Sequence, residues 1–205
     1  MDTKAKKRIR RIRLVECFST FIICFLIFQA KDFVVALMTP ADSYQIRYEE
    51  PVGVNNGQKI YSLYRNDDYF MFDADVNEFM LLDADGNTDI KYCVIMHEAR
   101  DLVYSVILGV MLLIVCNIAH SVIDGVSPFT RKNTGRIRLI GALQFCLAVV
   151  PGLVVFLMKF FRFEYSNLGF GMDNIYMFII GFAIMTIAQV FDYGVKLQED
   201  VDSIA

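Results

Sequence analysis

The sequence predicts an all-α membrane protein with four transmembrane helices and a small β-rich extracytoplasmic loop between the first and second helices. Three observations support this fold class. The chain of 205 residues is 56% apolar and has a mean hydropathy of +0.43, which does not suit a water-soluble domain. Four segments are long enough to cross a bilayer core, which takes about 20 apolar residues. The charged residues are sorted by region, although the net charge is only -3. We therefore expect one four-helix membrane domain, residues 1–205, with residues 39–98 as a loop insertion.

The first predicted span, residues 14–38, follows a block of basic residues. Residues 1–13 carry seven basic side chains against the single acid Asp2. Basic residues are retained on the inner side of a membrane, so this block places the N-terminus in the cytoplasm. A nucleic-acid patch is the other interpretation of the block. A signal peptide is the other interpretation of the span, but no clear cleavage site follows it. Glu16 and Lys31 lie near the two ends of the span, where their charges reach the interfaces.

Residues 39–98 form the predicted extracytoplasmic loop. Twelve acidic residues against four basic ones give this segment a charge of -8. An acidic loop that follows a helix with a cytoplasmic N-terminus belongs outside the cytoplasm. Short runs rich in aromatic and aliphatic residues alternate with turn formers in this loop. These runs are residues 59–64, 69–72, 78–82 and 90–96. We expect a small antiparallel sheet or a pair of hairpins.

The acidic stretch of residues 83–89, Asp-Ala-Asp-Gly-Asn-Thr-Asp, has the closely spaced carboxylates of a calcium loop. An EF-hand places glycine at its sixth position and a bidentate glutamate at its twelfth. With Gly86 as the sixth residue, the first would be Leu81 and the twelfth Tyr92, so the pattern fails at both ends. We interpret the stretch as an Asp-Gly-Asn turn between two strands. A weak cation site is the alternative.

The positions of the cysteines and the lack of recognisable catalytic motifs in the sequence do not indicate an enzyme. Four of the five cysteines fall in apolar spans and only Cys93 lies outside them, so no disulfide framework is predicted. No pair of cysteine or histidine residues has the spacing of zinc ligands. The sequence shows no nucleophile–base pair, metal-ligand set or glycine-rich phosphate loop. We therefore expect no enzymatic activity and no cofactor.

The second predicted span, residues 102–123, returns the chain to the cytoplasm. It contains Asn117 and His120, which lie three residues apart on one helical face. An ionisable group inside a membrane is a candidate functional residue. His120, however, lies only about one turn from the inner end, where it reaches headgroups or water. Its two interpretations are an interfacial or packing histidine and a sensing or proton-handling one.

The link from Asp124 to Gly141 is a short polar connection between the second and third spans. Asp124 and Gly125 form the predicted turn. Ser127 is expected to cap the next helix, with Pro128 at the first helical position. Four basic residues against one acid give the link a charge of +3, which agrees with a cytoplasmic location. This charge is explained either by topology and headgroup binding or by a protein-docking face.

The third and fourth predicted spans are residues 137–161 and 172–195. Pro151 near the middle of the third span predicts a bend, because proline removes a backbone hydrogen bond. The chain ends inside in an acidic tail, residues 191–205, with a charge of -3. Because the tail and the link have opposite charge on the same side, we expect an acid of the tail to pair with an arginine of the link. The acids are Glu199, Asp200 and Asp202, and the arginines are Arg131, Arg136 and Arg138.

Two groups of residues on this side carry a family resemblance. They are Asp124, Gly125, Ser127, Pro128, Phe129, Thr130, Asn133, Arg136, Arg138, Ile140 and Gly141 in the link, and Phe191, Gly194, Leu197, Gln198, Glu199 and Asp200 in the tail. Together they resemble the two cytoplasmic signatures of the DUF2975 membrane proteins, over roughly half of the chain. The resemblance implies a four-helix bacterial membrane protein of unassigned biochemical activity, often found beside a small helix-turn-helix DNA-binding regulator. The last four residues depart from the family, which more often has an Asp-Leu-Thr-like ending.

These observations predict a multi-pass protein of the cell membrane with both termini in the cytoplasm. We expect it to contact membrane lipid and to act as a regulatory or sensing partner of a cytoplasmic helix-turn-helix regulator, without binding nucleic acid itself. The expected contact residues are Asp124, Gly125, Ser127, Pro128, Phe129, Asn133, Arg136, Arg138, Gly194, Gln198 and Asp200. A small transporter or transporter accessory subunit is the alternative. Transporters usually need polar or charged groups near the bilayer midplane. The notable polar residues inside the spans are Asn117, Gln144, Thr186 and Gln189, and none of them is charged.

Overall fold

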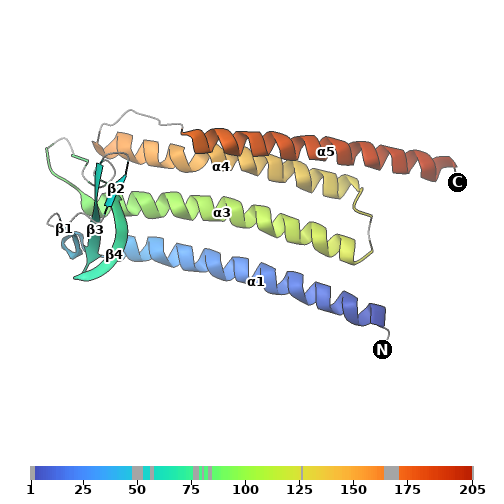
Figure 1. Ribbon diagram of the computed structural model, residues 1–205, viewed down its shortest axis with the longest axis horizontal. Helices are drawn as coiled ribbons and strands as arrows, with labels where there is room; N and C mark the ends of the chain where they lie inside the picture. The colour runs from blue at the N-terminus through green and yellow to red at the C-terminus, as the bar shows by residue number, and fades with distance from the viewer. Residues whose placement is uncertain are drawn as a thin grey trace. The chain divides into compact units, whose positions relative to one another are not determined.

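Four long α-helices make up most of the chain in the computed structural model (Figure 1). They are α1 (Thr3–Met38), α3 (Ile90–Ile123), α4 (Arg131–Phe163) and α5 (Met172–Ile204). The structure describes residues 3–47, 53–55, 58–75, 79, 81–82, 85–125, 127–163 and 171–204. Each helix contains a segment of 30 to 34 residues that is long enough to cross a membrane, and within it an 18-residue stretch with a mean hydropathy between 1.8 and 2.5. The four predicted helices are confirmed, and the chain has the make-up of a multi-pass membrane protein.

Three of the helices, α1, α3 and α5, extend well beyond their predicted spans. α1 begins at Thr3 because the basic residues before the span are good helix formers, with no glycine or proline among them. α5 continues to Ile204, since no glycine or proline follows Gly194 in this helix. At about 1.5 Å per residue, the 33 residues of α5 reach about 50 Å, whereas the hydrocarbon core is about 30 Å thick. Part of α5 therefore lies outside the core, and the charged residues between Asp192 and Asp202 favour its C-terminal end for that part.

α3 begins at Ile90, which corrects the prediction that residues 90–96 belong to the sheet. The reason is a helix cap at Asp89. Its carboxylate oxygen Oδ1 accepts a hydrogen bond from the backbone N–H of Tyr92 at 3.0 Å, as an N-cap residue does. Oδ2 of Asp89 also lies 3.1 Å from Nη2 of Arg162. A short apolar run does not by itself distinguish a strand from a buried helix, so the cap decides the outcome.

The loop between α1 and α3 folds into the small antiparallel sheet that the sequence predicts. After a short 3-10 helix, η1 (Ala41–Ser43), come β1 (Tyr44–Arg47), β2 (Gly53–Asn55), β3 (Gln58–Arg65) and β4 (Asp68–Asp75). β3 is the central strand, because β1 and β2 pair with its two halves and β4 pairs along its length. The tight turn between β3 and β4 contains Asn66 and Asp67 at φ angles of 52° and 64°. Asn and Asp tolerate this left-handed conformation better than most residues.

A turn is present at the predicted Asp-Gly-Asn stretch, but it does not join two named strands, because α3 begins at Ile90. Gly86 has a φ angle of +79°, and Leu82 and Thr88 form a single antiparallel bridge around it. Asp83 and part of the predicted run 78–82 lie outside the described residues. Within the described part of the chain, no group of three or more histidine, cysteine, aspartate or glutamate side chains is placed to hold a metal ion.

The chain divides into two compact units. The first, here named the sheet unit, comprises Gln29–Leu102 and Gly152–Leu168. Its core brings together side chains of the sheet and of three helices, each at most 9% exposed: Ala36, Tyr44, Ile46, Leu63, Phe79, Cys93, Val94 and Phe163. The second, the helix unit, comprises Met1–Phe28, Val103–Pro151 and Gly169–Ala205. It contains both the link and the tail.

Helices within the helix unit approach one another closely at glycines. A Cβ atom on Gly109 of α3 would lie 2.9 Å from a methyl carbon of Leu26 in α1. A Cβ on Gly181 of α5 would lie equally close to the ring of Phe145 in α4. Small residues allow this approach, which favours van der Waals packing between membrane helices. The described contacts thus join α1 to α3 and α4 to α5.

Candidate functional site

The link ends in a capped start of α4. The hydroxyl oxygen of Thr130 accepts a hydrogen bond from the backbone N–H of Asn133 at 3.1 Å, so Thr130 is the N-cap. This corrects the prediction that Ser127 caps the helix with Pro128 at its first position. The hydroxyl oxygen of Ser127 accepts instead from the backbone N–H of Phe129 at 3.2 Å, which stabilises the turn before the helix. Serine and threonine both cap helices well, so composition does not choose between them.

Side-chain contacts join the link to the last turns of α5. The Ser127 hydroxyl donates to the side-chain oxygen of Gln198 at 3.0 Å. The Arg131 guanidinium donates two hydrogen bonds to the Glu199 carboxylate, at 2.9 and 3.0 Å. Such a bidentate pair fixes orientation as well as distance. We name the group formed around these contacts the loop–tail cluster: Ser127, Phe129, Arg131, Asn133, Phe191, Gly194, Gln198 and Glu199.

An aromatic contact forms the apolar part of the loop–tail cluster. The ring of Phe129 lies against Gly194, where a Cβ atom would come within 2.6 Å of Cδ1 of the ring. Gly194 therefore provides the space that the ring occupies. The ring of Phe191 lies 5.1 Å from that of Phe129, centroid to centroid, within the range of favourable aromatic pairs. Three residues of the two predicted signatures thus make one packing contact.

Asn133 is the buried polar residue of the cluster, with 0% of its surface exposed. Its Nδ2 donates to the backbone carbonyl of Pro128 at 3.4 Å, and its Oδ1 accepts from Nη1 of Arg136 at 3.0 Å. The same Nη1 donates to the backbone carbonyl of Asn117 in α3 at 3.2 Å. Asn133 and Arg136 therefore tie the link to α3 and α4.

The predicted pairing of link and tail is confirmed for Arg131 and Glu199. Arg138 pairs with Asp192, at 3.5 Å, rather than with an acid nearer the end of the chain. The side chains of Arg131 and Glu199 are 81% and 50% exposed, so water screens the pair, and it orients the tail more than it stabilises the fold. The loop–tail cluster does not include Asp200, whose backbone carbonyl accepts a hydrogen bond from Ser203.

Glu199 and Arg131 lie outside the predicted spans, and their contact shifts both protonation equilibria. The hydrogen bond from Arg131 lowers the pKa of Glu199, and the same hydrogen bond raises the pKa of Arg131. A carboxylate with a lowered pKa stabilises the fold above its ordinary pKa, and this contribution is lost as the pH falls through the lowered value. At neutral pH both groups are charged.

The turn at the end of α3 agrees with the prediction for Asp124 and Gly125. Gly125 has a φ angle of +87°, a conformation that favours glycine. Nδ1 of His120 lies 2.9 Å from Oδ2 of Asp124, four residues further along the chain. This carboxylate accepts the hydrogen on Nδ1, so His120 has a polar partner at the end of its helix.

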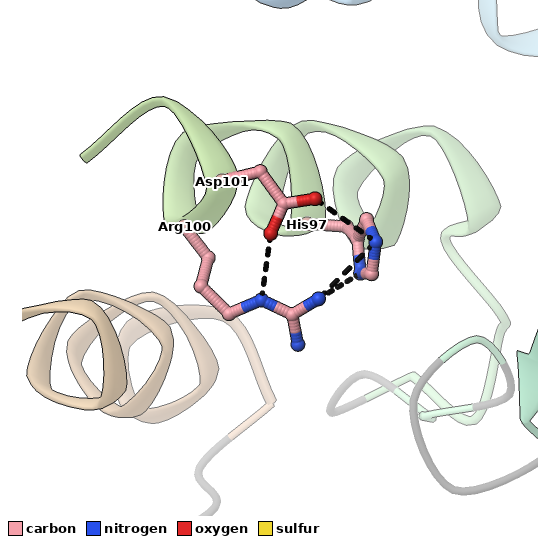
Figure 2. A network of polar contacts seen from close by, with 3 residues as sticks. All are labelled: His97, Arg100 and Asp101. Atoms are coloured by element: carbon pink, nitrogen blue, oxygen red, sulfur yellow. Dashed lines mark hydrogen bonds and ion pairs between the residues drawn. The ribbon is translucent and has the colours of Figure 1, made fainter. Parts of the chain in front are cut away.

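A second polar network lies near the start of α3, in the sheet unit (Figure 2). Nε of Arg100 lies 3.1 Å from Oδ1 of Asp101, and Nη2 of Arg100 lies 2.9 Å from Nδ1 of His97. The imidazole Nε2 lies 3.4 Å from Oδ2 of Asp101. Beside this network, burial raises the pKa of Glu98, and the charges of Asp32 and Asp101 raise it further. Glu98 precedes the predicted span 102–123. The spacing of three and four residues along one helical face is the signal for this network in the sequence.

Comparisons of the chain with protein-family models, with curated proteins and with solved structures found no match. Function is therefore inferred from the residues and their geometry. Asp192 and the capping role of Thr130 were not among the predicted site features. The sequence feature that could have indicated Asp192 is its negative charge on the same predicted side as the basic link. The feature that could have indicated the helix cap is the position of Thr130 shortly before the apolar run.

Proposed function

We propose that this chain is a multi-pass protein of the cell membrane that holds a cytoplasmic DNA-binding regulator at the end of α5. Four spanning helices would bring both termini to the same side of the membrane. The basic residues of the N-terminal block and of the link favour the cytoplasm for that side. The activity proposed is binding, with no catalytic step.

An apolar stripe on the last turns of α5 carries this proposal. Tyr193, Leu197 and Val201 follow one another at intervals of four residues, so they share one face of the helix. Their exposed fractions are 65%, 49% and 64%. Leu197 and Val201 lie past the predicted span, among charged residues. An exposed apolar stripe with a charged rim is typical of a protein interaction site.

The loop–tail cluster supports the proposal by holding this part of α5 in place. Val195, which is 5% exposed, lines a small groove with Phe129 on the side of the cluster. The stripe lies on the other side of the helix, away from Val195. A helix held in its bound conformation loses less conformational entropy when a partner binds. An amphipathic helix of the partner is the occupant that fits an apolar stripe of this kind.

Two further features favour a DNA-binding regulator as the partner. Asp200, which the cluster does not include, precedes Val201 at the edge of the stripe and is exposed. It would accept a basic side chain, the type that DNA-binding proteins carry in abundance. The resemblance to the DUF2975 proteins implies a helix-turn-helix regulator as a neighbour. In this proposal the link residues that resemble the family position α5, and the tail residues meet the regulator.

The test is co-purification of the chain and its partner from native membranes. We expect a helix-turn-helix protein in near-stoichiometric amount, identified by mass spectrometry. The combined substitutions Leu197→Ser and Val201→Ser should weaken its binding at least about tenfold, because two buried apolar side chains contribute more than 1.4 kcal/mol. Arg136 and Arg138 contact other parts of this chain, so substitutions in the stripe separate binding from folding more cleanly.

A matched control uses two exposed apolar residues of α5 inside the predicted span. Ile187 and Val190 are 50% and 62% exposed. The pair Ile187→Ser and Val190→Ser changes the same chemistry but should leave the partner bound. If no DNA-binding protein is recovered, or if the stripe variant retains it fully, the proposed function is wrong.

A small transporter or transporter accessory subunit is the second candidate, favoured by a polar pocket between α1 and α3. Solute flux by the purified chain in liposomes, combined with the lack of a recovered partner, would support this candidate instead.

A further inference from the structure

We propose that a polar pocket between α1 and α3 binds a primary ammonium group. The pocket lies in the helix unit and has a volume of about 400 Å³. Its polar lining consists of Glu16, Ser19, Thr20, Cys116, Asn117 and His120. This site is separate from the stripe on α5, and the inference does not depend on the proposed regulator.

The pocket gathers polar residues from two facing helices. Glu16, Ser19 and Thr20 are spaced by three and four residues, so they lie on one face of α1. Asn117 and His120 share a face of α3 in the same way. A second cavity between these two helices is lined mainly by phenylalanine, leucine and isoleucine side chains. The polar groups are therefore concentrated at one level of the helix pair, which marks a functional site in a membrane protein.

The α1 side of the pocket offers hydrogen-bond acceptors. The Ser19 hydroxyl donates to the backbone carbonyl of Val15, and the Thr20 hydroxyl donates to that of Glu16, both at 3.0 Å. Each hydroxyl has only one hydrogen, so its oxygen is left as an acceptor. The ionised Glu16 carboxylate accepts hydrogen bonds only. This side thus presents three acceptor groups and one negative charge.

The α3 side does not neutralise that charge. His120 directs Nδ1 to Asp124, at 2.9 Å. Arg136 reaches the backbone carbonyl of Asn117, and its guanidinium also binds Asn133. Among the residues that the structure describes, Glu16 has no ion-pair partner. Glu16 is exposed and lines the pocket, so its carboxylate is open to a cationic partner.

The chemistry of the lining selects a primary ammonium group among cations. Such a group carries three N–H donors, which match the three acceptor groups of α1. A quaternary ammonium has no N–H donor and prefers an aromatic cage, whereas this pocket has no phenylalanine or tyrosine in its lining. The described residues also show no cluster of metal ligands.

A primary ammonium could reach the pocket from two sources. One is the headgroup of phosphatidylethanolamine, because Glu16 lies near the predicted inner end of its span. The other is a small soluble amine from the cytoplasm. Both sources present the same –NH₃⁺ group to Glu16, and the experiment distinguishes them.

The test measures lipid retention by the purified full-length chain with native mass spectrometry. Detergent micelles would contain equal amounts of phosphatidylethanolamine and phosphatidylcholine, whose headgroups have the same charge but differ in N–H donors. We expect at least about tenfold preference for phosphatidylethanolamine, since a hydrogen bond to a charged group contributes about 1.5–3 kcal/mol. Glu16→Gln keeps the shape of the side chain and should remove this preference. Thr20→Val removes one acceptor and should reduce it severalfold.

Two controls complete the design. Asp42→Asn removes one negative charge from an exposed residue of η1, far along the chain from the pocket residues, and should leave the preference unchanged. Ethanolamine added to lipid-free protein tests the soluble source through the thermal unfolding midpoint. A lipid preference without an ethanolamine effect assigns the headgroup as ligand. A rise of the midpoint with ethanolamine that Glu16→Gln abolishes assigns a soluble amine.

Either of these two results supports the ammonium site. Equal retention of the two lipids together with no effect of ethanolamine overturns it. Where the wild type prefers phosphatidylethanolamine, unchanged selectivity in Glu16→Gln also overturns it, and so does a rise of the midpoint with ethanolamine that Glu16→Gln retains. If Glu16→Gln does not fold, Thr20→Val decides, and wild-type selectivity in that variant overturns the proposal.

Discussion

The contact between Gly194 and Phe129 makes a sharp prediction for Gly194→Ala. The new methyl group would lie 2.6 Å from Cδ1 and 3.0 Å from Cε1 of the ring. An ordinary carbon–carbon contact is about 3.5–4.0 Å, so the ring has to retreat by roughly 1 Å. The ring of Phe191, three residues before Gly194 in α5, lies 5.1 Å from that of Phe129, centroid to centroid, so the ring is packed against two residues of α5.

Two opposing terms set the size of the effect. Alanine in place of a helical glycine stabilises a helix by about 1 kcal/mol. Overpacking of a filled contact costs about 1–3 kcal/mol. The net change for Gly194→Ala is therefore between zero and about 2 kcal/mol of destabilisation. Gly135→Ala in α4 is the matched control, since a Cβ there meets nothing within 4 Å and only the stabilising term applies.

The assay is thermal unfolding of both variants in the same detergent. A difference of 1 kcal/mol shifts the midpoint of a protein of this size by about 2–4 °C. We expect the Gly194→Ala variant to unfold several degrees below the Gly135→Ala variant. Adding Phe129→Leu to Gly194→Ala should recover part of the loss, because the smaller side chain removes the overlap. Equal midpoints for the two alanine variants would refute the packing of Phe129 on Gly194.

Three further predictions concern polar groups. Arg131→Glu or Glu199→Arg alone should expose the tail to limited proteolysis, with little loss of global stability because the pair is exposed. The double reversal should restore protection, and single variants as resistant as the wild type would contradict the pair. Asn133→Leu should lower the unfolding free energy by about 1–3 kcal/mol, because the substitution leaves the carbonyl of Pro128 and the guanidinium of Arg136 without a buried partner. Thermal unfolding measures this loss of stability, and no loss would show that water replaces these hydrogen bonds. Glu98→Gln should raise the unfolding midpoint at about pH 7 and have little effect at about pH 4. Burial raises the pKa of Glu98, so the charge of this carboxylate opposes folding above that pKa. Below the ordinary glutamate pKa, the carboxyl is protonated in both the folded and the unfolded state. An equal difference at both pH values would mean that the effect of Glu98 is not electrostatic.

Much of the fold followed from local properties of the sequence. Apolar length predicted the four helices, and the alternation of apolar runs and turn formers predicted β3 and β4. Residues 90–96 were assigned wrongly, because an apolar run of this length suits a strand or a helix equally well. The cap at Asp89 decides between them, and its hydrogen bond to Tyr92 forms only when the helix does.

The ion pair between the link and the tail was predicted from charge alone. Opposite charges in the link and the tail indicated a contact, because both segments were assigned to one side of the membrane. The sequence did not indicate which arginine meets which acid: Arg131 binds Glu199, while Arg136 binds a backbone carbonyl of α3. That choice depends on the rotation and the register of neighbouring helices.

The sequence by itself determined the four helices and the strands β3 and β4, since apolar length and turn formers are properties of neighbouring residues. Only the tertiary structure decided which distant residues meet. It brings Phe129 onto Gly194 and places Glu16 in one pocket with Asn117. These contacts depend on how the side chains of separate helices pack together, and the sequence of one helix does not determine how that helix aligns with its neighbour.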